Sequence, residues 1–321
     1  MSSHDDFYGS LQRLAEGALT ARKKRRLKQR MKQQSKHWLR DWAEAILWAV
    51  CMVLLINQYI FQMYRIPSPS MSGSLEVGDM IFVNKMVYGP ELLPGVAKLP
   101  GFRAARRNEV VVFENPAYLS KGPAFTILKQ FVYMLTLTMV DIDRDENGEQ
   151  RVHYLIKRAI GVGGDTIRAV RGDMEFRFKG SDEWVTEAAF KAASGAAYPT
   201  RRMLGPADYA ELEAAGVAAA YLDMGLVPPS NPQGRAVYDE FAFNRARLNV
   251  LAEAYPHQQR VVGEARKLGQ GWYVPRGRVF TLGDNRDNSR DARWYGAVDG
   301  KKVLGHALFI YWPLPRVGGI R

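Results

Sequence analysis

Apolar residues are gathered in one long run and in several short ones along the chain of 321 residues. The long run, 45–64, contains 20 residues without a charged side chain and lies between Glu44 and Arg65. A helix of that length reaches about 30 Å, which is the thickness of the hydrocarbon core of a bilayer. The run therefore predicts one transmembrane helix, with a buried helix of a soluble domain as the alternative.

The short runs are rich in β-branched and aromatic residues and are bounded by Gly, Pro and Asn, as strands are. They occupy residues 80–84, 109–113, 152–160, 278–282 and 306–312. Short strands separated by turns predict a mostly antiparallel all-β domain. Residues 188–256 differ, because Ala, Glu, Leu and Arg recur there at helical spacing with Pro breaks. They predict an inserted, partly helical subdomain.

Two segments between these elements have weaker patterns. Residues 124–140 are strongly apolar but too short and interrupted to cross a bilayer. They favour a core element, with a surface that dips into the membrane interface as the alternative. Residues 143–148 begin like a calcium-binding loop, but Tyr154 stands where a bidentate Glu belongs, so a hairpin turn is favoured.

The net charge of +12 first indicates a nucleic-acid-binding protein, but its distribution argues otherwise. Residues 22–40 contain ten basic and no acidic side chains, so the remainder of the chain carries only +2. A basic segment directly before an apolar run is typical of the cytoplasmic flank of a membrane helix. The late start and the length of the apolar run also argue against a cleaved leader.

These patterns predict a domain order. It is a polar segment 1–21, a basic cytoplasmic flank 22–44, a membrane anchor 45–64, a main β domain 65–175 and 272–321, and an insert 176–271.

Several kinds of chemistry are excluded by composition. Cys51 is the only cysteine, which leaves no internal disulfide and no zinc site built from several thiolates. The five histidines show no HExxH or other paired spacing. The sequence therefore predicts neither a metal nor a cofactor.

Three polar features remain as candidates for nucleophilic chemistry. Ser68 stands between two prolines and Ser70 follows the second one. The fixed φ angle of proline restricts the orientation of a neighbouring serine, although a linker that leaves the membrane would have a similar sequence. Lys157 lies in an apolar strand pattern, where burial would lower its pKa, although a solvent-facing lysine is the common case. Residues 282–296 pack many polar groups between two apolar runs, and a solvated turn is the alternative.

Taken together, these features resemble bacterial type I signal peptidase, the leader peptidase family. The resemblance covers 60–115, 152–175 and 272–312. It rests on Ile-Pro-Ser-Pro-Ser-Met at 66–71, Gly-Asp-Met-Ile-Phe-Val-Asn-Lys at 78–85, Ile-Lys-Arg-Ala-Ile-Gly at 156–161 and Gly-Asp-Asn-Arg-Asp-Asn-Ser-Arg-Asp-Ala-Arg at 283–293.

The resemblance implies a Ser-Lys dyad without histidine. Ser70 matches the family's nucleophile and Lys157 its general base. A free lysine, with a pKa of about 10.4, is protonated at neutral pH, so the base has to be desolvated. Ser289 matches the serine that orients this lysine.

Three further positions follow from the same resemblance. Ser68 matches the residue whose hydroxyl joins the nucleophile's own N–H in stabilising the oxyanion. Asp291 and Arg293 match a pair that braces the site from behind. The chain departs from the family pattern at Pro69, where Gly is usual, and at Gly73, where Pro is usual. These departures bear on the shape of the substrate cleft more than on the chemistry.

The implied reaction is cleavage of N-terminal signal peptides from exported preproteins after Ala-x-Ala-like sites. The implied partners are these preproteins and the lipid bilayer, and no nucleic acid is involved. The implied location is the bacterial cytoplasmic (inner) membrane, single-pass, with the N-terminus cytoplasmic and the catalytic domain outside. The alternatives are a specialised processor of the same family, an inactive homologue blocked at Pro69, and a non-catalytic membrane-anchored binding protein.

Overall fold

The computed structural model describes residues 3–93, 97–118, 122, 125–126, 128–129, 132, 142–144, 152–230 and 239–320. The segments 124–140 and 143–148 lie largely outside these residues. Contacts divide the chain into two compact units, Met1–Leu55 and Ile56–Arg321.

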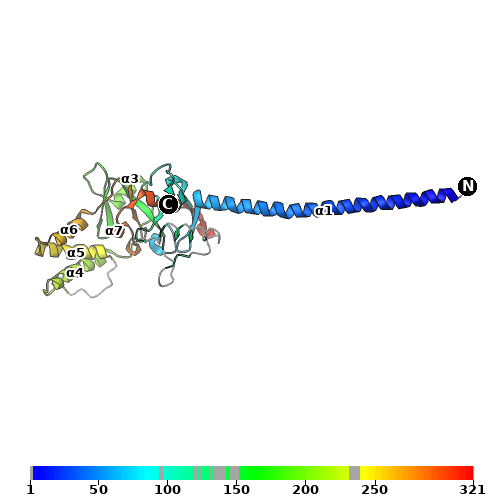
Figure 1. Ribbon diagram of the computed structural model, residues 1–321. Coiled ribbons are helices and arrows are strands. Elements are labelled where there is room, and N and C mark those ends of the chain that lie inside the picture. The colour runs from blue at the N-terminus through cyan, green and yellow to red at the C-terminus, as the bar shows by residue number, and fades with distance from the viewer. Residues whose placement is uncertain are drawn as a thin grey trace. The chain divides into compact units, whose positions relative to one another are not determined.

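The first element is the long helix α1, Ser3–Tyr59, which includes the basic segment (Figure 1). It ends five residues before the predicted end at 64, because Phe61–Arg65 form strand β1 and pair with a neighbouring strand. The predicted boundary is therefore wrong at its C-terminal end. Among the residues described, no helix combines the length and the apolar character needed to cross a membrane.

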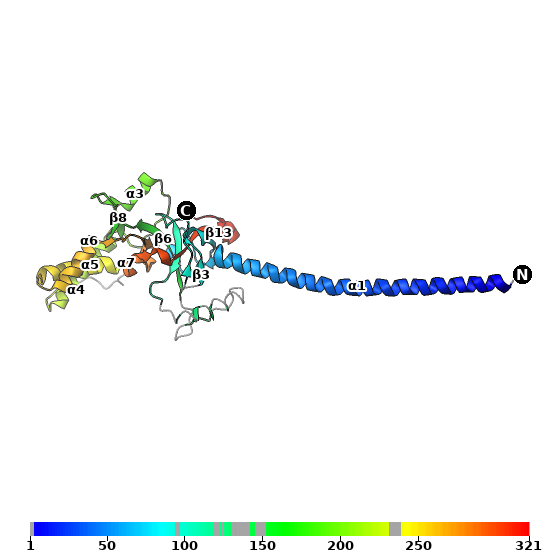
Figure 2. The ribbon, with the colours of Figure 1, turned by 45° about the horizontal axis from the view of Figure 1, so that its top comes forward.

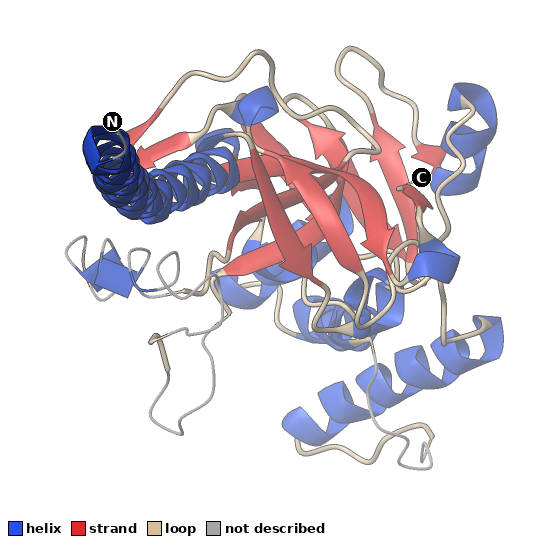
Figure 3. Ribbon diagram, turned by 90° about the vertical axis from the view of Figure 1, so that its right-hand side faces the viewer, coloured by secondary structure: helices blue, strands red, loops and turns tan. Residues whose placement is uncertain are grey.

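The main sheet follows the order β1-β2-β13-β5-β6-β11-β12, with β14 beside β13, and every pair is antiparallel. Figure 3 shows the strands of the protein in red. Its strands after β1 are β2 (Met80–Asn84), β5 (Val110–Glu114), β6 (Tyr154–Val162), β11 (Arg278–Leu282), β12 (Val298–Asp299), β13 (Val303–Trp312) and β14 (Gly318–Gly319). The prediction of a mostly antiparallel β domain is confirmed, and each short apolar run coincides with or overlaps a strand.

Two smaller sheets complete the β structure of the described chain. One has the order β10-β7-β8-β9 and contains β7 (Thr166–Val170), β8 (Asp173–Arg177), β9 (Val185–Thr186) and β10 (Trp272–Tyr273). The other pairs β3 (Glu91–Leu93) with β4 (Ala97–Lys98). The turn from β6 into β7 needs glycine, because Gly164 has a φ of 106°.

The chain between β9 and β10 is helical. It contains α3 (Glu187–Ser194), α4 (Pro206–Asp223), α5 (Glu240–Ala254) and α6 (Gln259–Gln270). Thr186 and Asp239 accept backbone N–H bonds at the starts of α3 and α5. Helices α4, α5 and α6 lie side by side (Figures 1 and 2). The helical insert predicted from residue spacing is therefore present.

The core extends over both faces of the central strand β5. On one face Val112 belongs to a cluster with Met71 and Ile81, and on the other Phe113 belongs to a cluster with Val279. Met71 follows Ser70 directly, so burial of its side chain fixes the segment that contains Ser70 against the sheet.

Candidate active site

Ser70 lies in a single 3₁₀ turn, Pro69–Met71, that follows β1. Pro69 occupies the first position of this turn, where a missing N–H costs nothing and the fixed φ angle fits. Ser68 precedes it in an extended conformation, and the N–H of Ser72 closes the turn on the carbonyl of Pro69 at 3.0 Å. The departure at Pro69 thus fits the local backbone and leaves Ser70 its own N–H.

Lys157 lies in β6, paired in register with Val111 of β5. Its side chain is almost entirely buried, with 3% of the residue exposed. The Nζ atom lies 2.6 Å from Ser70 Oγ and donates to the carbonyl of Ile156 at 3.0 Å. Burial lowers the pKa of Lys157 to about 8, against the opposing charges of Asp291 and Asp284. The neutral amine is therefore accessible near neutral pH.

The two serines of the predicted oxyanion site lie close together. Ser68 Oγ is 3.4 Å from Ser70 Oγ. Both side chains stand at the same turn, and Ser68 is exposed, so its hydroxyl is free to rotate toward a bound group.

Ser289 follows the 3₁₀ turn η3, Arg286–Asn288. Its Oγ is buried and has no hydrogen-bond partner within the described chain, so the predicted bond to Lys157 is not formed. Gly283 separates Ser289 from the turn that contains Ser70. A Cβ added at Gly283 would come within 2.2 Å of Ser289 Oγ and 2.5 Å of the Ser70 carbonyl oxygen. The two segments therefore approach each other as closely as glycine permits.

Asp291 and Arg293 are buried next to each other at the start of helix α7, Ala292–Tyr295. Arg293 Nε donates to Asp291 Oδ1 at 2.9 Å, and the N–H of Gly283 donates to Asp291 Oδ2 at 3.1 Å. Arg293 also donates to the carbonyl of Arg286 at 2.5 Å. This pair holds both ends of the loop that carries Ser289.

Asn285 contacts the turn that contains Ser70 directly, a role that the sequence did not indicate. Its backbone N–H donates to the carbonyl of Ser70 at 3.1 Å, and its side-chain amide donates to the carbonyl of Pro69 at 3.0 Å. Its place in the most specific motif was the only signal available in the sequence.

A buried ion pair beside Lys157 was likewise not predicted. Arg158 donates to Asp284 Oδ1 at 2.8 Å and to Oδ2 at 2.7 Å, and both side chains are almost fully buried. Ser74 Oγ donates to the same carboxylate at 2.6 Å. Arg158, Asp284 and Ser74 thereby link the motifs at 156–161 and 283–293 to the turn that follows Ser70.

The other lysine in a quoted motif has a different partner. Lys85 is buried, and its Nζ donates to Gln62 Oε1 at 2.9 Å. Burial lowers the pKa of Lys85 to about 8 as well, so pKa alone does not distinguish the two lysines. The contact with Ser70 does.

The histidine chemistry of common hydrolases has no counterpart at this site. His153 Nε2 lies 2.6 Å from Asp143, and His306 pairs with Asn84 in the main sheet. Within the described ranges, no group of three or more His, Cys, Asp or Glu side chains is arranged to hold a metal ion.

Comparison with known proteins decides the family of this chain. The model of the family described as signal peptidase, peptidase S26, matches residues 39–312. The chain belongs to this signal peptidase family. It is therefore a peptidase, which hydrolyses peptide bonds.

Relatives named Signal peptidase I align with most of the chain. The protein from Haemophilus influenzae is 27% identical over 278 residues, covering 83% of this chain and 68% of the relative. The protein from Aquifex aeolicus is 28% identical over 271 residues, covering 82% of this chain and 80% of the relative. The protein from Pseudomonas aeruginosa is 24% identical over 281 residues, covering 84% of this chain and 72% of the relative. The resemblance stated from the motifs is thus confirmed at the level of the family.

Proposed function

We propose that this member of the signal peptidase family is a membrane-bound endopeptidase that removes N-terminal signal peptides from exported preproteins. Ser70 is its nucleophile and Lys157 its general base. The observation that carries the proposal is the 2.6 Å separation of Lys157 Nζ and Ser70 Oγ in a buried setting. The names of the relatives supply the substrate class.

The acylation step needs a neutral lysine. Lys157 Nζ takes the proton of Ser70 as Oγ attacks the carbonyl carbon of the scissile peptide bond. The Ser70 N–H and the Ser68 hydroxyl, whose Oγ lies 3.4 Å from Ser70 Oγ, serve as the donors to the oxyanion that forms. The lysine ammonium then gives its proton to the leaving nitrogen, which releases the mature protein and leaves the signal peptide as an ester on Ser70.

Deacylation uses the same groups. The neutral lysine takes a proton from a water molecule, which attacks the ester carbonyl, and the proton returns to Ser70 Oγ as the ester bond breaks. Ser289, whose buried hydroxyl has no partner among the described residues, is available to accept a hydrogen bond from the lysine ammonium. Asp291, Arg293 and the Arg158–Asp284 pair keep the surrounding backbone in place.

Membrane association is supported by two apolar surfaces. The segment 45–59 of α1 has exposed Leu47 and Val53, and ten basic residues precede it. The outer face of the main sheet has Phe82 next to Met63 and Phe309 in register, where a solvated sheet would be polar. We assign the basic flank to the cytoplasm and the β domain to the outer face of the bacterial inner membrane.

The specificity for Ala-x-Ala-like sites rests on the resemblance alone. A specialised processor would use the same dyad on a different preprotein, and an inactive homologue would show the same contacts without turnover. A test against several preproteins separates these alternatives from the main proposal.

The test is cleavage of a preprotein with an Ala-x-Ala site by the full chain in detergent, with the new N-terminus read by mass spectrometry. Wild type and the exposed-site control Ser181→Ala should cut after the second Ala, and Ser70→Ala should not cut. Cleavage by Ser70→Ala at the wild-type rate would refute the assignment. No cleavage of any of several preproteins by wild type would favour the inactive homologue.

A further inference from the structure

The helical insert contacts the Ser289 loop through the backbone. The N–H of Arg201 donates to the carbonyl of Asp284 at 2.8 Å, and the N–H of Arg286 donates to the carbonyl of Arg201 at 3.0 Å. Arg201 and Asn285 thereby form an isolated parallel bridge. The segment after α3 thus lies along the loop that also binds the nucleophile turn.

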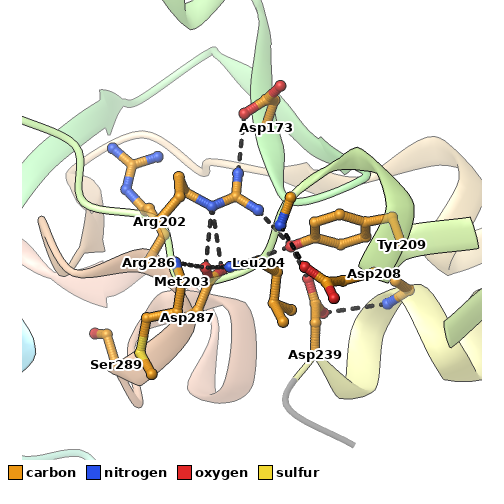
Figure 4. A network of polar contacts seen from close by, with 12 residues as sticks. Asp173, Arg202, Met203, Leu204, Asp208, Tyr209, Asp239, Arg286, Asp287 and Ser289 are labelled. Atoms are coloured by element: carbon orange, nitrogen blue, oxygen red, sulfur yellow. Dashed lines mark hydrogen bonds and ion pairs between the residues drawn. The ribbon is translucent and has the colours of Figure 1, made fainter. Parts of the chain in front are cut away.

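Asp287 of this loop is surrounded by donors from the insert (Figure 4). Arg202 Nε lies 3.1 Å from Oδ1, while the backbone N–H groups of Met203 and Leu204 donate to Oδ2 at 2.5 and 3.0 Å. The side chain of Asp287 is only 1% exposed. Hydrogen bonds of this kind to an ionised, buried carboxylate are among the stronger ones in proteins.

The same network reaches the two longest helices of the insert. The Arg202 guanidinium donates to the hydroxyl of Tyr209 on α4, and that hydroxyl donates to Asp239 Oδ2 at 3.0 Å. Asp239 in turn accepts the first N–H groups of α5. Figure 4 shows these side chains converging between the loop and the starts of both helices.

The same loop also contacts the turn that contains Ser70. Asp287 stands two residues before Ser289, and Asn285, two residues before Asp287, binds the Ser70 carbonyl. Pro199 of the insert also lies against the nucleophile segment, since a Cβ at Gly73 would be 3.2 Å from it. A shift of the backbone at Asp287 would therefore displace Ser289 and Asn285, and through Asn285 the turn that contains Ser70.

We propose that Asp287 is a positioning residue, through which the inserted helices hold the Ser289 loop against Ser70 and Lys157. The inference rests on the proposed function of the dyad. It gives the insert a role in the reaction itself, in addition to any role in stability.

The test uses the full chain in detergent with a signal-peptide substrate. Asp287→Asn removes the carboxylate charge with little change of shape, and Tyr209→Phe removes only the hydroxyl that links Arg202 to Asp239. Asp223→Asn is the matched control, because it breaks a half-exposed pair with Arg247 that links α4 to α5 away from the loop. For each variant, kcat, KM, the pH profile of kcat and the melting temperature are measured.

We expect kcat to fall at least tenfold in Asp287→Asn and at least threefold in Tyr209→Phe, with KM within twofold of wild type. A loosened loop exposes Lys157 to water, so the rising limb of the pH profile should move to higher pH in both variants and stay in place in Asp223→Asn. If Asp287→Asn does not fold, the pH profile of kcat for Tyr209→Phe alone tests the inference.

Two results would overturn the inference while leaving the dyad intact. One is wild-type activity in both variants. The other is an activity loss that follows the folded fraction with an unmoved pH profile, which would mark the network as structural only. Failure of the proposed function itself is recognised separately, by an inactive wild type or an active Ser70→Ala.

Discussion

At the scale of single residues, the proposed dyad depends on a lysine that is buried where its charge is destabilising. Lys157 is buried in a strand and faces Ser70 Oγ, and the carboxylates of Asp284 and Asp291 offset only part of the desolvation. Residues at such sites are arranged for chemistry more often than for stability. The free energy of unfolding should show this cost.

Replacing Lys157 by Met should therefore stabilise the protein while abolishing activity. A folded-state pKa of about 8, below the ordinary value of 10.5, means that the unfolded state binds more protons between these pH values. Stability of the wild type rises with pH across that window, and below pH 8 the full cost, on the order of 3 kcal/mol, is present. Thermal unfolding of both proteins at pH 7 and pH 10 measures it.

The stability advantage of Lys157→Met should be large at pH 7 and mostly gone at pH 10. Lys267→Met, at an exposed position on α6, is the control and should show no such pH-dependent gain. An advantage that is absent at pH 7, or equal at both pH values, would contradict the pKa assigned to Lys157.

At the scale of elements, the sequence predicted the strands better than the contacts between them. Short runs of β-branched and aromatic residues located β2 and β11 at their observed bounds. The helix predicted over 45–64 ended too late, because nothing in an apolar run indicates that its last residues pair with Met80–Asn84. Such long-range pairing is set by tertiary structure and leaves little trace in local composition.

In the candidate site, too, the sequence identified individual residues but not the long-range contacts between them. Ser70 and Lys157 could be named from motifs, and the structure places them in contact. The roles of Asn285 and Arg158 could not, because each depends on a backbone carbonyl or a carboxylate supplied by a distant segment. The helical spacing of the insert likewise gave no sign that Arg201 and Arg202 contact the loop that contains Asp287 and Ser289.

The close approach of the nucleophile turn and the Ser289 loop yields a prediction at Gly283. A methyl group there would clash with Ser289 Oγ at 2.2 Å and with the Ser70 carbonyl, so the two segments would have to separate. Gly283→Ala should lower kcat at least a hundredfold in protein that remains folded by circular dichroism. Gly263→Ala, in α6 with open space around it, should retain wild-type turnover. Comparable activity of the two variants would show that the close approach has no role in catalysis.

At the scale of the whole molecule, apolar residues gather where a water-exposed sheet would be polar. The rings of Phe82 and Phe309 stack with centroids 5.0 Å apart, and Trp312 is exposed further along β13. This face begins at β1, and a single residue, Ile60, separates β1 from the end of α1. We expect it to rest on the bilayer, which would bring the site close to the membrane-held end of a preprotein.

Substituting Phe309 and Trp312 together by Ser should lower activity at the membrane without changing the catalytic step itself. Activity on a preprotein reconstituted in vesicles should fall severalfold, since apolar area is lost from the bilayer contact, while activity on a short soluble peptide should stay within twofold. Tyr273→Ser is the control, because Tyr273 is an exposed aromatic residue of the second sheet, 61% exposed against 39% for Phe309 and 48% for Trp312. Equal losses on both substrates would argue against a membrane-contacting face.

The most direct test of the Ser70–Lys157 dyad is the pH dependence of kcat/KM for the wild-type enzyme on a soluble signal-peptide substrate. A neutral Lys157 acting as the base for Ser70 predicts a rate that rises with pH, with a single apparent pKa near 8, and then levels off. A maximum below about pH 6, or a rate that falls as pH increases from 7 to 9, would contradict the Ser70–Lys157 dyad.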